Sequence, residues 1–216
     1  MSNFDPVALA LFMGAISLVP LLMVSCTAFL KVSVVLLILR NVLGVQQVPS
    51  NLSVYGISLV LTAFVMMPTL QKVQDQWGVA EFRTDNISQM FDRSVQAVQP
   101  IKSFMIRFTR PDQLTAFHQS AKMASDKEGV EAPKKQDFMV VMPAFVISEL
   151  SSAFEIGFIL ALPFVVIDLV VSNILMALGM MMMSPASISL PLKMLLFISV
   201  DGWSRLFLGL ATGYAL

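Results

Sequence analysis

The chain of 216 residues contains one cysteine, Cys26, and one histidine, His118. A single cysteine cannot form a disulfide within the chain, so the cysteine content does not indicate whether the protein's compartment is oxidising or reducing. A zinc-type site needs several Cys or His ligands, and one of each argues against such a site within one copy. We therefore predict neither a metal ion nor a cofactor.

Charge is also scarce, because only 13% of the residues are Asp, Glu, Lys or Arg, against about a quarter in soluble domains. The formal net charge is zero, so the chain has no excess of basic residues that would indicate nucleic-acid binding. Apolar residues make up 56% of the chain, and the mean hydropathy is +0.79. This composition indicates a membrane protein or a subunit buried in a very apolar assembly.

The few charges are unevenly distributed. Residues 71–137 hold ten Lys or Arg and nine Asp or Glu, which leaves nine charged residues for the rest of the chain. We therefore expect three segments: an apolar helical block at 1–70, a polar helical insert at 71–137 and a second apolar helical block at 138–216. The fold class expected is all-α, with long, proline-kinked, membrane-associated helices and helical hairpins.

The first apolar block predicts two helices. Asp5 and Pro6 are typical of a helix start, and the apolar run that follows is too long for one span of about twenty residues. Pro20 predicts a kink in this run, and Gly44 predicts its end. A second helix is expected at about 52–70, capped by Ser50 or Asn51, with Pro68 near its end.

The insert is expected to contain three helices. Apolar residues follow a helical period from Ile87 to Val98, and Pro100 predicts a break before a second helix that ends near Phe108. Pro111 fits the first turn of a third helix. The stretch 125–137 has no apolar period and predicts a loop.

Prolines also mark the helices expected in the second apolar block. Pro143 and Pro163 each predict a helix start, and Pro191 predicts the start of the last helix. Asp201 and Arg205 are spaced to pair on that last helix.

Carboxylates on these apolar helices allow two interpretations. Glu149 and Glu155 share one face of their helix, and Asp168 follows on the next, so acid–base chemistry or cation binding is conceivable. No His or Cys lies near them to complete a catalytic set, so we predict no catalytic residues and no enzyme. Pairing with cations of the same or another chain is the favoured interpretation. The charges expected to be buried or between subunits are Lys31, Arg40, Glu149, Glu155, Asp168, Lys193 and Asp201.

Four consecutive methionines, Met180, Met181, Met182 and Met183, stand between Gly179 and Pro185. Gly179 predicts a helix end and Pro185 prevents its continuation, so the methionines are expected in a turn. Turns usually carry Gly, Asn, Asp or Ser, whereas methionine is flexible and packs against irregular partners. In a ring of subunits, copies of such a turn could form a flexible constriction in a pore. The simpler alternative is that the methionines fill a protein core or contact lipid.

Four stretches resemble the signature motifs of the FliP/SctR family, the core export-apparatus proteins of type III secretion systems and bacterial flagella. They are RNVLGVQQVPSN (40–51), LPFVVIDLV (162–170), GMMMMSP (179–185) and DGW (201–203). The resemblance covers both apolar blocks but not the insert. Because no signal peptide precedes the first apolar run, the chain looks more like the injectisome branch than the flagellar one.

The resemblance implies a homo-pentamer that joins SctS-like and SctT-like subunits at the entry of the secretion channel. Such a subunit is expected in the bacterial inner membrane, multi-pass or embedded in the core of the machinery, with the insert on the periplasmic side. It would pass secreted polypeptides, and Met180 to Met183 match the family's gasket, which limits leakage. The alternative is a small transporter that couples ions through Glu149, Glu155 and Asp168, although no internal repeat is visible.

Overall fold

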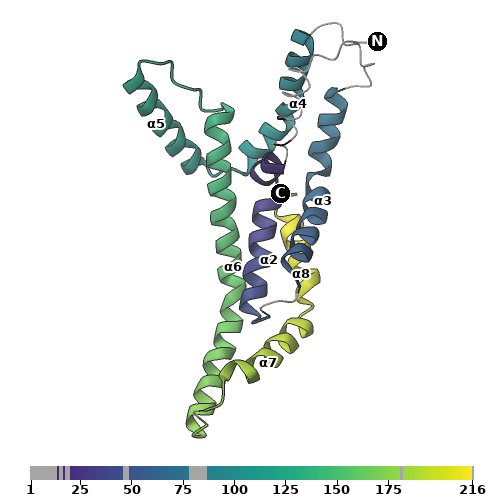
Figure 1. The fold of residues 1–216 in the computed structure, drawn as a ribbon, viewed down its shortest axis with the longest axis vertical. Coiled ribbons are helices and arrows are strands. Elements are labelled where there is room, and N and C mark those ends of the chain that lie inside the picture. Colours follow the sequence, from purple (N-terminus) through teal and green to yellow (C-terminus); the bar gives the residue numbers. More distant parts are fainter. Residues whose placement is uncertain are drawn as a thin grey trace. The chain divides into compact units, whose positions relative to one another are not determined.

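A computed structural model describes Gly14, Ser17 and residues 20–45, 49–77, 87–180 and 182–215, and these residues form helices, turns and no strand. The predicted all-α class is confirmed, whereas the expected helix start at Asp5 and Pro6 lies outside the described residues. The labelled helices are α2 (Phe29–Val42), α3 (Asn51–Trp77), α4 (Ile87–Phe108), α5 (Pro111–Glu128), α6 (Phe138–Ala177), α7 (Pro185–Ser199) and α8 (Gly202–Thr212) (Figure 1).

The chain divides into two compact units. One comprises residues 1–30 and 69–147, and the other comprises residues 31–68 and 148–216. Each unit combines stretches that are distant in sequence, and helices α3 and α6 each contribute to both. The division into segments 1–70, 71–137 and 138–216, which rested on charge, stays a prediction.

The core of the second unit forms around α2. Buried apolar residues of α2 recur at helical spacing along one face, and α3, α6, α7 and α8 supply the rest of the core. A glycine allows α2 and α6 to pack closely, since a Cβ atom at Gly157 would lie 2.5 Å from Cδ1 of Ile38. The core residues are Val32, Val35, Leu36, Leu39, Leu43, Val54, Ala153, Phe164, Phe197, Leu206 and Leu210.

Replacing Gly157 by alanine should destabilise the folded chain, although alanine is the better helix former. The new methyl group would overlap Ile38, and overpacking of this kind costs about 1–3 kcal/mol. Gly209→Ala is the matched control, because a Cβ atom there meets nothing within 4 Å. Thermal unfolding of the purified subunit should show a lower midpoint for Gly157→Ala alone. Equal midpoints for the two variants would contradict the close packing at Gly157.

Several predicted helix boundaries at prolines are wrong. Pro100 and Pro191 lie inside helices, and α6 runs unbroken for 40 residues through Pro143 and Pro163. Pro68 lies inside α3 as expected, although that helix continues to Trp77. A proline removes only one intrahelical hydrogen bond, and packing in apolar surroundings can outweigh that loss.

The first apolar run breaks at Thr27 and Ala28. The kink expected at Pro20 stays a prediction, because residues 18 and 19 lie outside the described part of the chain. Thr27 stabilises the break, because its hydroxyl donates to the carbonyl of Met23 and accepts the amide of Phe29. Such side-chain bonds compete with the helical ladder.

Boundaries set by glycine and by capping residues are confirmed. Gly44 and Gly179 follow α2 and α6 in the left-handed conformation, with φ of +80° and +72°. Ser50 caps α3 by accepting the amide of Ser53 at 3.3 Å. Pro111 opens α5 as expected, but this helix extends to Glu128, so the predicted loop at 125–137 begins only at Gly129.

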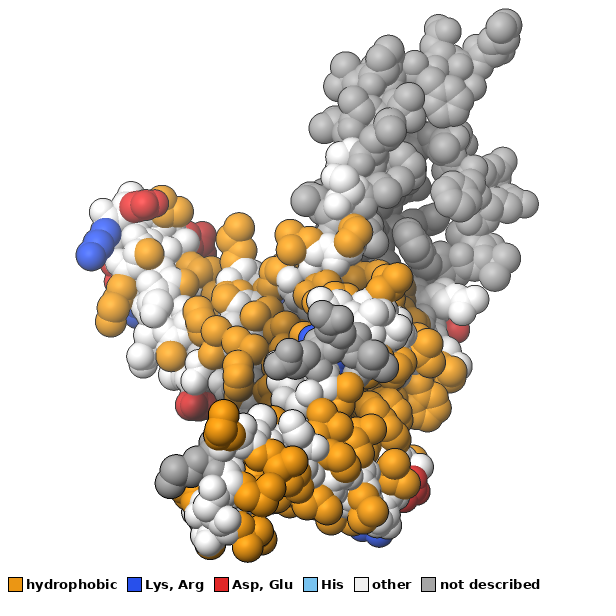
Figure 2. All heavy atoms as spheres, turned by 60° about the horizontal axis from the view of Figure 1, so that its bottom comes forward, with side chains coloured by type: hydrophobic (Ala, Val, Ile, Leu, Met, Phe, Trp, Pro, Cys, Tyr) orange, Lys and Arg blue, Asp and Glu red, His pale blue; other side chains and the backbone are white. Residues whose placement is uncertain are grey.

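In the part of the chain that the structure describes, two helices are long and apolar enough to cross a membrane, α3 over Asn51–Asp75 and α6 over Phe138–Ala177. The number rises to four if each of two bent helix pairs counts as one span, and in the second of these α7 meets α8 at 60°. At 1.5 Å per residue, α6 is about 60 Å long, roughly twice the thickness of a hydrocarbon core. Hydrophobic side chains cover much of the face drawn in Figure 2. Many large hydrophobic side chains of the described residues are therefore exposed in the single chain.

Candidate functional site

The methionine turn, defined here as residues 179–185, is held by its backbone. The amide of Gly179 donates to the carbonyl of Met176 at 3.0 Å, and the amide of Met180 donates to the carbonyl of Leu175 at 2.9 Å. The amide of Met183 donates to the carbonyl of Met180 at 3.2 Å. Pro185 then opens α7 at a position that needs no amide donor. Within the described part of the turn, these hydrogen bonds join backbone groups and use no methionine side chain.

The described methionines of this turn are exposed, as the turn prediction requires. Met182 is fully exposed, and Met180 and Met183 retain 42% and 45% of their accessible surface. Met181 lies outside the described residues. In Figure 1 the turn joins α6 to α7 at the lower tip of the ribbon, away from the part of the second unit where α2, α3 and α8 pack. The second unit therefore presents thioethers rather than a polar loop at its tip.

A buried ion pair joins α2 and α6. Nζ of Lys31 lies 2.9 Å from Oε1 of Glu149, and only 12% and 1% of these side chains are exposed. The hydroxyl of Tyr214, which follows α8, donates to Oε2 of Glu149, and Nζ of Lys31 lies 4.2 Å from the centre of the Tyr214 ring. Burial and the nearby carboxylate raise the pKa of Tyr214, which keeps this hydroxyl a donor. The Lys31–Glu149–Tyr214 cluster thus ties three distant segments together.

A second ion pair joins α6 to α7. Nζ of Lys193 donates to Oδ2 of Asp168 at 2.6 Å and to the carbonyl of Val42, the last residue of α2, at 3.0 Å. The buried Ser189 also hydrogen-bonds to Asp168. The Asp168 side chain is 43% exposed, whereas Lys193 is buried. This pair therefore remains partly open to its surroundings, unlike the first.

The other charges singled out in the sequence are not gathered with these pairs. Arg40 closes the connection after α2, where Nη1 donates to Oδ1 of Asn51 at 2.5 Å and to the carbonyl of Pro49 at 3.3 Å. Glu155 is exposed on α6. Asp201 accepts the hydroxyl of Ser204 at 2.9 Å, and no ion pair joins it to Arg205 among the described residues. Within the described ranges, no group of three His, Cys, Asp or Glu side chains could hold a metal ion.

Tyr214 and Ser189 complete the two clusters, and sequence reasoning missed both. Neither belongs to a motif, and each lies at least 21 residues from the carboxylate that it contacts. A buried carboxylate such as Glu149 needs partners beyond one cation, and this need could have prompted a search for Tyr214. No comparable signal pointed to Ser189, because Asp168 is partly exposed.

One face of α6 is apolar and exposed. Its exposed residues recur every three or four positions, and the opposite face carries Glu149, Ala153, Gly157 and Phe164 toward the core. The exposed face comprises Phe154, Phe158, Leu162, Val165 and Leu169.

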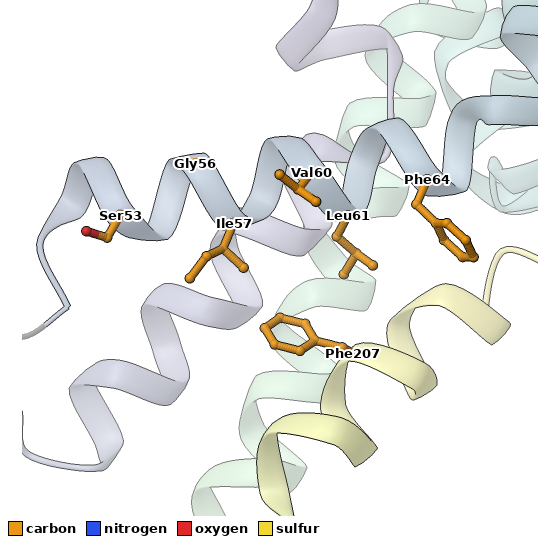
Figure 3. A pocket seen from close by; sticks show the side chains of 7 residues that line it. All are labelled: Ser53, Gly56, Ile57, Val60, Leu61, Phe64 and Phe207. Carbon is orange, nitrogen blue, oxygen red and sulfur yellow. The ribbon is translucent and has the colours of Figure 1, made fainter.

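A second apolar surface is a groove of about 670 Å³ between α3 and α8. Figure 3 shows Phe207 of α8 reaching toward Ile57 and Leu61 of α3, with Ser53 and Phe64 farther along the same helix. The lining is almost entirely apolar, so the groove offers packing rather than polar recognition.

Comparison with known proteins matches residues 12–210 to the model described as the FliP family. The chain is 46% identical to the harpin secretion protein HrcR of Erwinia amylovora, over 98% of each chain. It is 40% identical to the Yop proteins translocation protein R of Yersinia pestis, over 97% of each. It is 41% identical to the flagellar biosynthetic protein FliP of Pectobacterium carotovorum, over 93% of this chain and 75% of the relative.

Proposed function

Because the chain belongs to the FliP family and is a component of a type III secretion export apparatus, we propose that it is a structural subunit of the export pore. Its task is to pass unfolded secreted proteins through the cell envelope while limiting the leakage of ions. The observation that carries this proposal is the methionine turn, which has backbone hydrogen bonds at Gly179, Met180 and Met183 and exposes its described thioethers.

The gasket role follows from the chemistry of the side chains in the turn. Copies of the turn around a common axis would place Met180, Met181, Met182 and Met183 in a narrow ring. An apolar constriction excludes ions because it does not stay wet. Thioether side chains have three rotatable bonds and adapt to irregular partners, so the ring could yield to a passing polypeptide.

The exposed apolar surfaces support assembly with other subunits. The exposed face of α6 and the groove between α3 and α8 leave large side chains uncovered in the isolated chain. Patches of this kind mark contacts with protein or membrane. We propose that other copies of the chain, in a homo-pentamer, and SctS-like and SctT-like subunits cover them, with lipid around the outside.

The proposed location is the bacterial inner membrane, with the polar insert at 71–137 on the periplasmic side. The membrane location is supported by α3 and α6, which are long and apolar enough to span a bilayer. The periplasmic side of the insert is inferred from Lys31 and Arg40, whose charges favour the cytoplasm for the connection after α2. The insert follows the next span, α3, and so would lie on the opposite side. The harpin and Yop relatives, which match along almost their whole length, favour the injectisome branch.

An ion-coupled transporter is the less favoured alternative. Such a protein needs carboxylates that can release and rebind a cation during its cycle. Glu149 and Asp168 instead contact lysines at 2.9 and 2.6 Å, in the manner of pairs that hold helices together. Nothing in the described residues favours coupling over a structural role.

The oligomeric mass of the chain, co-expressed with its SctS-like and SctT-like neighbours, tests the proposal. Mass determination of the detergent-solubilised complex should show several copies of this chain together with both neighbours. A monomer or dimer free of both neighbours would contradict the proposal and favour the transporter.

A further inference from the structure

We propose that the methionine turn is also an oxidation site, at which peroxide converts exposed thioethers to sulfoxides and thereby opens the ion seal. The inference rests on the proposed gasket and adds a form of regulation to the same residues. Three observations carry it: the exposure of the sulfur-bearing side chains, the independence of the turn from them, and the opposite polarity of the oxidised product.

Exposure favours this turn as a place of reaction. Met182 is the most exposed of the methionines that the structure describes, and Met180 and Met183 stand beside it. Met66 and Met105, by contrast, are buried in helices. In the proposed ring the dry constriction lies on the channel axis with water at its two edges, so a small peroxide would reach the turn from the channel without passing through a protein core. The susceptibility of a sulfur atom to oxidation follows its exposure.

The turn should survive the reaction. Its amides bond to backbone carbonyls of Met176, Leu175 and Met180, and Gly179 supplies the left-handed conformation. No hydrogen bond within the described part of the turn uses a methionine side chain. Oxidation therefore changes the surface of the turn while its path is retained.

The product reverses the property that makes the ring a seal. Each thioether sulfur takes one oxygen atom from hydrogen peroxide, forming an S–O bond while the O–O bond breaks and one molecule of water leaves. Sulfur is oxidised and the peroxide is reduced. The sulfoxide is polar where the thioether was apolar. Methionine sulfoxide reductases restore the thioether with two electrons and two protons from an added dithiol, and the oxygen leaves as water. A polar ring holds water, so ions that a dry constriction excludes can cross it.

The test uses the assembled complex in lipid vesicles, treated with dilute hydrogen peroxide. Peptide mass spectrometry locates the sulfoxides, and the release of a trapped potassium gradient measures ion leakage. We expect sulfoxide in the turn, and a several-fold rise in leakage that follows the fraction of turn sulfoxide and reverses after treatment with the reductases. The matched control replaces Met180 to Met183 by leucine, which keeps the ring apolar but cannot be oxidised.

The leucine control separates the turn from other exposed methionines. Met123 and Met139 remain oxidisable in it, so leakage that they cause would persist. Unmodified turn methionines, or leakage that rises equally in the leucine control, would overturn the inference. So would turn sulfoxide without leakage, provided that replacement of the turn by alanine does cause leakage. If the alanine complex is itself tight, the gasket is wrong and the inference fails with it.

Discussion

Replacing Met180 to Met183 together by alanine is expected to leave the export complex assembled but permeable to small ions. Each substitution removes most of a long apolar side chain from the tip of the second unit, so the proposed ring widens and fills with water. The helices on either side keep their packing, because the turn is held by backbone bonds such as that from Met180 to Leu175.

Two measurements on the alanine variant belong together. The yield of purified complex should equal that of the unaltered protein, while ion conductance across membranes that contain it should rise strongly. The variant with four leucines should stay tight, because it preserves apolar bulk. Unchanged conductance in an intact alanine complex would mean that the methionines serve packing or lipid contact.

The second large effect is expected at the Lys31–Glu149–Tyr214 cluster. Glu149→Ala leaves the ammonium group of Lys31 buried without its carboxylate, and stranding one member of a buried pair costs about 3–5 kcal/mol. This loss is a large fraction of the stability of a typical domain, so the yield of folded subunit and of complex should fall sharply.

Two further variants show whether the charge is the cause. Tyr214→Phe keeps the ring beside Lys31 and removes only one hydrogen bond to a charged group, which is worth about 1.5–3 kcal/mol. The pair Lys31→Met with Glu149→Leu removes both charges and should recover much of the stability. The midpoints of thermal unfolding of the detergent-purified subunit rank the stability of these variants and of Glu149→Ala. A double variant no more stable than Glu149→Ala would contradict the stranded-charge explanation.

Asp168→Ala should destabilise the folded chain less than Glu149→Ala, because the lysine that it leaves behind keeps another partner. Lys193 is buried, but after loss of the Asp168 carboxylate its ammonium group would keep the bond to the carbonyl of Val42.

Composition and the methionine motif could predict the fold class and the methionine turn. The fold class could be predicted because helices with one buried face repeat their apolar residues at helical spacing. The turn could be predicted because Gly179 and Pro185 restrict the backbone on either side of it. Lys31 and Lys193 were expected to meet carboxylates because charge is costly in apolar surroundings. Which carboxylate each lysine meets could not be predicted, since 118 residues separate Lys31 from Glu149 and only the packed helices bring them together.

The prolines show where local reasoning fails. Pro143 and Pro163 were expected to start helices, yet α6 passes through both. The local cost of a proline is one hydrogen bond and a steric clash, while the opposing gain comes from packing that no short window contains. Gly157 was missed for the same reason, because its importance lies in Ile38 on another helix.

If the methionine turns of separate copies meet around one axis, as we propose, cysteines placed in them should cross-link. Cys26 is the only native cysteine and is buried, so Cys26→Ser gives a background in which new cysteines can be compared. Met182→Cys probes the turn, and Met123→Cys, at an exposed position on α5, is the control. Under mild oxidation of the intact complex, we expect covalent dimers of this chain for Met182→Cys and none for Met123→Cys. An intact complex in which Met182→Cys forms no dimers would contradict this arrangement of the turns.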